Sequence, residues 1–105
     1  MSSDKRVFVC TTSELAPGSI KLVERDEGNL AVCNVDGTIH VVDDRCTHGL
    51  ASLAEGAIVD GEIECPMHFG MFDLKTGKPT AAPCSVPIRV YEVAVEGDRV
   101  FAVVG

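Results

Sequence analysis

Two short segments of this chain combine cysteine with histidine. The first is Cys46-Thr47-His48 and the second is Cys65-Pro66-Met67-His68, with sixteen residues between His48 and Cys65. Thiolates and imidazoles are common ligands of zinc and iron in proteins. Two of each fit either a tetrahedral zinc ion or a two-iron, two-sulfide cluster in which cysteines hold one iron and histidines the other. The two segments therefore indicate a metal centre.

The order of the four side chains favours the cluster over zinc. Zinc fingers with this ligand set usually present a cysteine pair and then a histidine pair, whereas this chain presents Cys, His, Cys, His. Cys46 and His48 are two residues apart, so both side chains point the same way in an extended loop. Pro66 breaks regular structure between Cys65 and His68 and predicts a tight loop. Two loops with one sulfur and one nitrogen each suit a two-iron cluster, and a structural zinc-binding module stays as the alternative.

With its flanking residues, this motif resembles the signature of the Rieske [2Fe–2S] proteins. That signature is C-x-H, a gap of about sixteen residues, and C-x2-H. The resemblance covers nearly the whole chain. The matching flanks are Asp44-Arg45, His48-Gly49, Glu64-Cys65-Pro66, Gly70-x-Phe72-Asp73, Thr76-Gly77-Lys78-Pro79 and a proline stretch from Pro83 to Pro87.

The resemblance implies one [2Fe–2S] cluster and assigns its ligands. By the family pattern, Cys46 and Cys65 hold the inner iron, and His48 and His68 hold the outer iron. The histidine edges, partly exposed in the family, are the expected exit for the electron. Two neutral imidazoles in place of two thiolates make the cluster less negative, so it accepts an electron more readily than a four-cysteine cluster does.

Departures from the respiratory branch of the family bear on the reduction potential. That branch has an additional cysteine in each ligand loop, and the two form a disulfide; here the positions hold Ala51 and Met67. It also has a serine and a tyrosine that hydrogen-bond sulfur, whereas the matching Gly70 and Phe72 carry no hydroxyl group. Fewer hydrogen bonds stabilise the reduced state less, so we expect a potential near the low end of the Rieske range, roughly −150 mV.

Length and charge limit the classes of function. A chain of 105 residues predicts one domain, residues 1–105. The net charge of −7 argues against binding to nucleic acid, which requires a basic surface. Neither an apolar run of about 18 residues nor the apolar stretch of a signal peptide is present. We therefore expect a monomer in the cytoplasm with no attachment to a membrane.

Short β-branched segments separated by turn residues predict an all-β fold. Asp36-Gly37 and Asp60-Gly61 are strong hairpin signals, and Thr12 to Leu15 could form a single helical turn. The fold expected is a Rieske-type antiparallel β-sandwich with an inserted cluster-binding subdomain. The predicted strands are Arg6–Cys10, Ser19–Glu24, Asn29–Asn34, Thr38–Asp43, Glu62–Cys65, Met71–Asp73, Ile88–Val95 and Arg99–Val103.

This pattern predicts a division within the domain. Residues of about 1–43 and 86–105 are expected to build the base sandwich, and residues of about 44–85 the cluster-binding part, with both ligand loops at its tip. Rieske proteins have the same arrangement, so the strand pattern and the resemblance agree.

The remaining cysteines and the third histidine are expected to have structural roles. Cys10 and Cys33 occupy predicted strands, where a free cysteine acts as a small buried hydrophobic residue. Cys84 lies in the proline stretch, which in the family is beside the cluster, and is expected to be an unreactive thiol. His40 is expected to be a solvent-facing strand residue, and Gly70 to allow close approach of the backbone to the cluster.

A fully ligated cluster offers no position for a substrate, so the sequence predicts an electron carrier and not an enzyme. The chain resembles the small Rieske ferredoxins of bacterial aromatic-ring dioxygenase systems. The resemblance implies two partners: an NAD(P)H-dependent ferredoxin reductase and a terminal Rieske non-haem iron oxygenase. An alternative is the small Rieske-like subunit of an assimilatory nitrite reductase, which often lacks the ligands. The surface expected to dock is His48, Gly49, Leu50, His68, Phe69 and the loop at Pro83.

Overall fold

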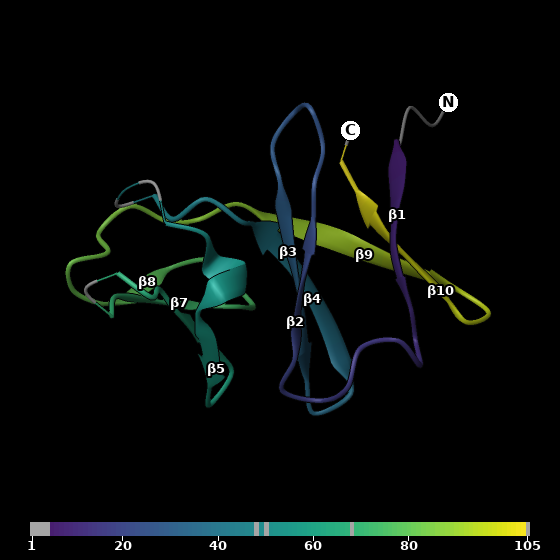
Figure 1. Cartoon of the computed structure of the whole chain (residues 1–105), viewed down its shortest axis with the longest axis horizontal. Helices are drawn as coiled ribbons and strands as arrows, with labels where there is room; N and C mark the ends of the chain where they lie inside the picture. The colour runs from purple at the N-terminus through teal and green to yellow at the C-terminus, as the bar shows by residue number, and fades with distance from the viewer. Residues whose placement is uncertain (1–4, 48, 50, 68, 105) are drawn as a thin grey trace.

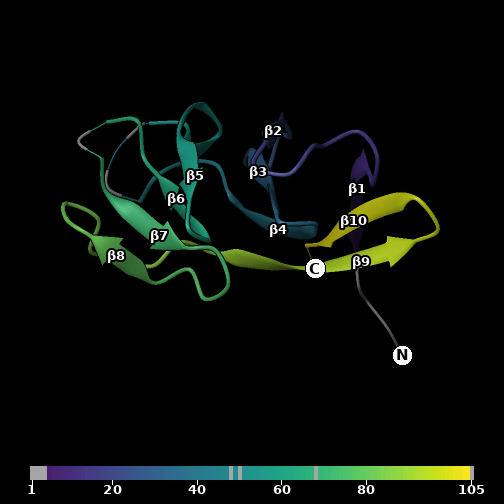
Figure 2. The same ribbon diagram turned by 90° about the horizontal axis from the view of Figure 1, so that it is seen from below.

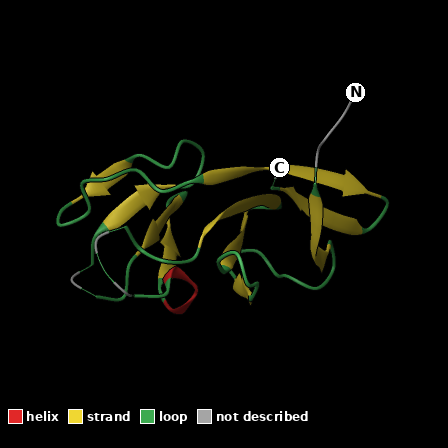
Figure 3. Ribbon diagram, turned by 90° about the horizontal axis from the view of Figure 1, so that it is seen from above, coloured by secondary structure: helices red, strands yellow, loops and turns green. Residues whose placement is uncertain are grey.

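The computed structural model describes residues 5–104 except 48, 50 and 68. Within these residues the chain forms two antiparallel sheets and one short 3-10 helix, η1, so the predicted all-β class is confirmed. Figure 3 shows η1 as the one helical segment among strands and loops. The elements are β1 Arg6–Thr11, β2 Ile20–Val23, β3 Leu30–Val35, β4 Thr38–Asp43, η1 Leu53–Glu55, β5 Ala57–Val59, β6 Glu62–Glu64, β7 Met71–Asp73, β8 Pro79–Ala81, β9 Val90–Glu96 and β10 Arg99–Val103.

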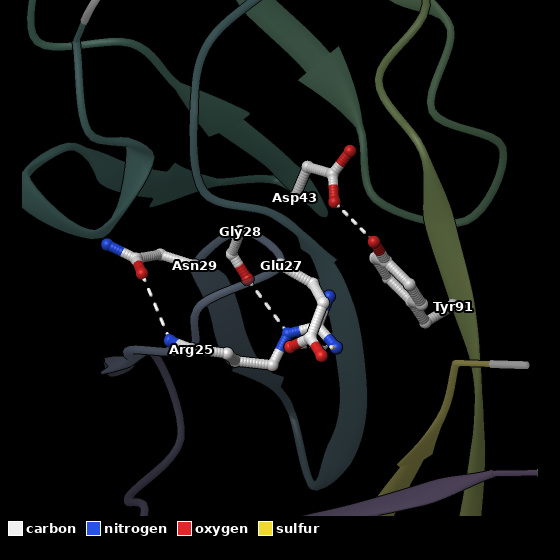
Figure 4. Close-up of polar contacts among 6 residues, drawn as sticks. All are labelled: Arg25, Glu27, Gly28, Asn29, Asp43 and Tyr91. Carbon is white, nitrogen blue, oxygen red and sulfur yellow. Dashed lines mark hydrogen bonds and ion pairs between the residues drawn. The ribbon is translucent and has the colours of Figure 1, made fainter.

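The larger sheet has six strands in the order β1-β10-β9-β4-β3-β2. Strand β9 joins its two halves, because Val90 and Tyr91 pair with β4 while the residues from Glu92 to Glu96 pair with β10. The Tyr91 hydroxyl donates a 2.5 Å hydrogen bond to the Asp43 carboxylate at the end of β4 (Figure 4). The long β9 starts on the side of the small sheet and runs along the curled sheet away from it (Figure 2).

The smaller sheet has four short strands in the order β5-β6-β7-β8. All four come from the chain between β4 and β9, and they lie beside the larger sheet (Figure 1). The two ligand loops belong to this part: the first follows β4, and the second joins β6 to β7.

Strand β3 separates two buried clusters. Alternate side chains of a strand point to opposite faces, so Ala31 and Cys33 pack in one cluster and Leu30 and Val32 in the other. All four are fully buried, which explains why β3 has a continuous apolar run instead of an alternating one. The first cluster joins the two sheets and contains Ala31, Cys33, Val42, Cys46, Ala51, Leu53, Ile63, Cys65, Phe72, Leu74, Cys84 and Ile88.

Tight turns at aspartate–glycine pairs set the register of two hairpins. Asp36 and Gly37 have φ values of 50° and 94°, and Asp60 and Gly61 have values of 51° and 80°. Two successive positive φ values are typical of a type I′ turn, which glycine and aspartate tolerate best. The connection from β2 to β3 is held differently, by Arg25 (Figure 4). Its Nε donates to the Gly28 carbonyl at 2.8 Å, and its backbone N–H to the Asn29 side chain at 3.2 Å.

The eight predicted strands are confirmed, with ends shifted by at most two residues. The sequence did not reveal β5 and β8, which have three residues each and form the edges of the small sheet. Pro79 is the first residue of β8, a position where a strand tolerates proline. Residues 12 to 14 form a hydrogen-bonded turn instead of the expected helical turn. Within the described residues, no helix has the length and apolar character needed to cross a membrane.

Candidate metal centre

Asp44 anchors the first ligand loop where it leaves β4. Its side chain is buried, and its carboxylate accepts a 2.8 Å hydrogen bond from the Ala54 backbone N–H in η1. Its backbone N–H donates to the Asn29 carbonyl at 3.0 Å, and its carbonyl accepts from the Leu53 N–H at 2.7 Å. These bonds hold the start of the loop against β3 on one side and η1 on the other.

Backbone pairing closes the first loop around Cys46. The Cys46 N–H donates to the Ala51 carbonyl at 3.0 Å, and the Gly49 N–H donates to the Cys46 carbonyl at 3.1 Å. Arg45 and Ser52 form an isolated antiparallel bridge at the base. Cys46 is 1% exposed, so the loop turns its cysteine inward.

The second loop connects β6 to β7 and is closed in a similar way. The Cys65 N–H donates to the Gly70 carbonyl at 2.7 Å, and Cys65 is fully buried. Phe69 has a φ of 60°, which is uncommon for a residue with a side chain and reverses the chain direction just before Gly70. The expected tight loop after Pro66 is therefore present.

The fold brings three cysteines together. Cys46, Cys65 and Cys84 belong to the same buried cluster, although they come from three separate segments of the chain. The Sγ atoms of Cys46 and Cys84 are 3.9 Å apart. The sequence predicts an unreactive thiol at Cys84. No short motif reveals its contact with Cys46, because the two residues are 38 positions apart.

The surroundings of Cys65 and Cys84 favour the neutral form of both thiols in the protein chain alone. Burial raises the pKa of the Cys65 thiol; a hydrogen bond from the Met67 backbone opposes the shift, and the Cys46 thiol adds to it. Burial, followed by the negative charge of Cys46, raises the pKa of Cys84 to about 12. A coordinated iron ion reverses this balance, because a thiol bound to a metal loses its proton. Two buried, soft donors from separate loops therefore fit a site for iron.

His48 and His68, the two predicted imidazole ligands, lie outside the described residues, and so does Leu50. Their described neighbours are placed: Thr47 is exposed, Met67 is 52% exposed and Phe69 is 66% exposed. The cysteine of each loop thus lies inside, whereas Thr47 before the first histidine position and Met67 and Phe69 on either side of the second lie at the surface.

Three apolar side chains in the second ligand loop and the proline stretch are exposed. They are Met67, Phe69 and Val86, all more than half exposed. The Thr47 hydroxyl donates a 2.7 Å hydrogen bond to the Val86 carbonyl, which ties the first ligand loop to the proline stretch. Exposed apolar patches on small proteins are often interaction sites.

Cys10, Cys33 and His40 lie in strands of the larger sheet and not in the ligand loops. Cys10 and Cys33 are fully buried in strands, as predicted, and burial raises the pKa of Cys33 to about 12. His40 is half-buried in a groove that includes Asp73 and Lys75, and it is less exposed than expected. Burial and then the charge of Lys75 lower the pKa of His40.

Comparisons with known proteins agree with this arrangement. The family model for the Rieske [2Fe–2S] domain matches residues 5–92. The ferredoxin component of the p-cumate 2,3-dioxygenase system of Pseudomonas putida is 45% identical over 101 residues, which cover 94% of this chain and 86% of that protein. Relatives at this level of identity share the fold.

Two solved structures are informative. A chain in a complex of reduced oxygenase and oxidised ferredoxin of carbazole 1,9a-dioxygenase is 41% identical, with a TM-score of 0.90, covering 93% of this chain and 92% of that one. A putative small subunit of an NADH-dependent nitrite reductase from Mycobacterium tuberculosis has a TM-score of 0.84 over 96% of each chain, but is 21% identical. The second likeness concerns the fold alone. This chain belongs to the Rieske [2Fe–2S] family as a ferredoxin component of aromatic-ring dioxygenase systems, an electron carrier and not the catalytic component.

Proposed function

We propose that this chain takes single electrons from an NAD(P)H-dependent ferredoxin reductase and delivers them to a terminal Rieske non-haem iron oxygenase. The proposed ligands of its one [2Fe–2S] cluster are Cys46, His48, Cys65 and His68. When bound, such a cluster supplies one-electron redox chemistry. In this proposal the protein works as a monomer in the cytoplasm, where the three cysteines that do not bind iron, Cys10, Cys33 and Cys84, stay reduced.

The observation that carries the ligand assignment is the convergence of Cys46 and Cys65. Both are buried in one cluster, and each is held in a loop closed by backbone hydrogen bonds. The exposed neighbours Thr47, Met67 and Phe69 bring both ligand loops to the protein surface. The buried thiolates would then lie on the protected side of the cluster, and a partner that docks on these loops would be close to it.

We propose that the same division extends to the whole domain. Residues of about 44–85, which contain the small sheet and both ligand loops, serve as the cluster-binding part. Residues of about 1–43 and 86–105 serve as the base. The hydrogen bond from Thr47 to Val86 and the shared buried cluster tie the two parts together, which keeps the ligand loops in fixed positions.

In this proposal both partners dock on the surface formed by the two ligand loops. The exposed apolar side chains of Met67, Phe69 and Val86 offer area for a partner that must bind and leave quickly. The net charge of −7 would steer this protein toward a basic patch on the partner. The complex of oxygenase and ferredoxin in the carbazole system supports the same class of partner here.

Purified protein tests the proposal directly. We expect a red-brown protein with two iron atoms and two sulfides per chain, and an EPR signal of the Rieske type after reduction. Mixed with a ferredoxin reductase, NAD(P)H and a terminal oxygenase, it should support product formation that stops when it is left out. Colourless protein with one bound zinc ion would contradict the cluster, and product formation independent of the chain would contradict the role as carrier.

The reduction potential gives a second, independent check. Gly70 and Phe72 offer no side-chain hydroxyl to the sulfurs, and Ala51 and Met67 cannot form the additional disulfide. We therefore expect potentiometric titration at pH 7 to yield roughly −150 mV, the low end of the Rieske range. A clearly positive potential would contradict this explanation and leave the ligand assignment intact.

A further inference from the structure

Cys84 lies between the two ligand loops, in contact with both. Its Sγ is 3.9 Å from the Sγ of Cys46 in the first loop. On its other side is Gly70, which closes the second loop: a methyl group built on Gly70 would be 2.3 Å from the Cys84 Sγ and 3.1 Å from its backbone nitrogen. Any side chain at position 70 would displace this thiol. The missing side chain at Gly70 leaves room for the Cys84 sulfur.

The position of Cys84 is set by the small sheet. The Cys84 N–H donates a 3.2 Å hydrogen bond to the Ala81 carbonyl at the end of β8. Strand β8 pairs with β7, which follows the second ligand loop directly. Cys84 is 6% exposed, so water does not compete for its thiol. The thiol is therefore held by the same framework that holds the ligand loops.

The chemistry of two neighbouring sulfurs decides which one donates. A cysteine that binds iron is a thiolate, which can only accept hydrogen bonds. A buried cysteine without a metal keeps its proton and is a weak donor. If Cys46 binds iron, as the proposed function requires, the pair at 3.9 Å has one donor, Cys84, and one acceptor, Cys46.

We propose that Cys84 is a positioning residue for the metal centre, whose S–H donates a hydrogen bond to the ligand sulfur of Cys46 and raises the reduction potential. An added electron increases the negative charge on the ligand sulfurs, so a donor to sulfur stabilises the reduced form more than the oxidised form. This inference rests on the ligand assignment under the proposed function.

Three variants of the holoprotein test it: Cys84→Ala, Cys84→Ser and, as a matched control, Cys33→Ala. Cys33 is fully buried in the same cluster, and no hydrogen bond to its sulfur is found within the described residues. We expect Cys84→Ala to lower the equilibrium constant for one-electron reduction by roughly three- to tenfold, where tenfold is 59 mV. Cys84→Ser keeps a donor and should recover most of the loss, and Cys33→Ala should leave the potential unchanged.

Infrared difference spectra between the oxidised and reduced forms provide a readout that packing alone would not move. In the unaltered protein, the S–H stretching band should shift on reduction, because the hydrogen bond strengthens. That shift should be absent from Cys84→Ala and Cys84→Ser and present in Cys33→Ala. Because the unaltered protein gives the signal by itself, the test holds even if a variant fails to load its cluster.

The outcomes separate this inference from the proposed function. An unaltered protein without a two-iron spectrum would overturn both. A loaded protein without an S–H shift, or a Cys84→Ala potential equal to that of Cys33→Ala, would overturn the role of Cys84 alone. Equal potentials for Cys84→Ala and Cys84→Ser would show that volume and not the donated proton matters, which also overturns it.

Discussion

Replacing Cys65 with alanine is expected to yield a colourless protein that contains little iron and carries no electrons. Cys65 is fully buried where β6 ends, and its N–H bond to Gly70 closes the second ligand loop. Alanine keeps that backbone bond but removes the thiolate. One iron would be left with a single protein sulfur in a site that water does not reach. Iron and sulfide analysis, the visible spectrum and the rate of electron delivery to an oxygenase measure the effect.

The matched control for this loss is Cys10→Ala. Cys10 is also fully buried, but it belongs to the other buried cluster, which the ligand loops do not join. The same atoms are removed, so the cost of a smaller side chain is similar. Cys10→Ala should keep its colour and its iron. A Cys65→Ala protein with the full content of iron and sulfide would refute the ligand assignment.

Replacing Phe72 with alanine is expected to cost about 3–5 kcal/mol of unfolding free energy, the range for deleting a buried aromatic ring. Phe72, in β7, has the largest fully buried side chain among the described residues, and it pairs with Ile63 of β6. It packs in the cluster that also contains Cys46 and Cys65, so the cavity would open in the same buried cluster as the two ligand cysteines. Since small domains are stable by only about 5–15 kcal/mol, a large fraction of the margin would be lost.

Chemical denaturation of the holoprotein, followed by circular dichroism and by visible absorption, measures this effect. Both transitions should move to lower denaturant concentration together, because the cavity weakens the fold and the site at once. Phe69→Ala is the control. Phe69 carries the same kind of ring but is 66% exposed, so its loss should change the unfolding free energy by about 0.5 kcal/mol or less. Equal midpoints for the two variants would contradict the structural role assigned to Phe72.

Much of the fold could be predicted because its signals are local. Alternating and continuous apolar runs marked eight strands, and aspartate–glycine pairs marked two turns. Local signals did not reveal β5 and β8, which lie at the edges of the small sheet. Unlike the equally short β6 and β7, they have no fully buried side chain to mark them, and they exist as strands through pairing with β6 and β7. Likewise, η1 forms where the Asp44 carboxylate accepts a backbone N–H, a contact between residues ten positions apart.

The sequence alone determined the kind of chemistry, because ligand type and spacing are written in two short segments around Cys46 and Cys65. Only the tertiary structure decided what surrounds those ligands. Sheet pairing and burial place Cys84 against Cys46 and leave room for its sulfur at Gly70, across separations of 38 and 14 residues. Contacts of this kind depend on how distant strands pack, and no spacing rule along the chain encodes them.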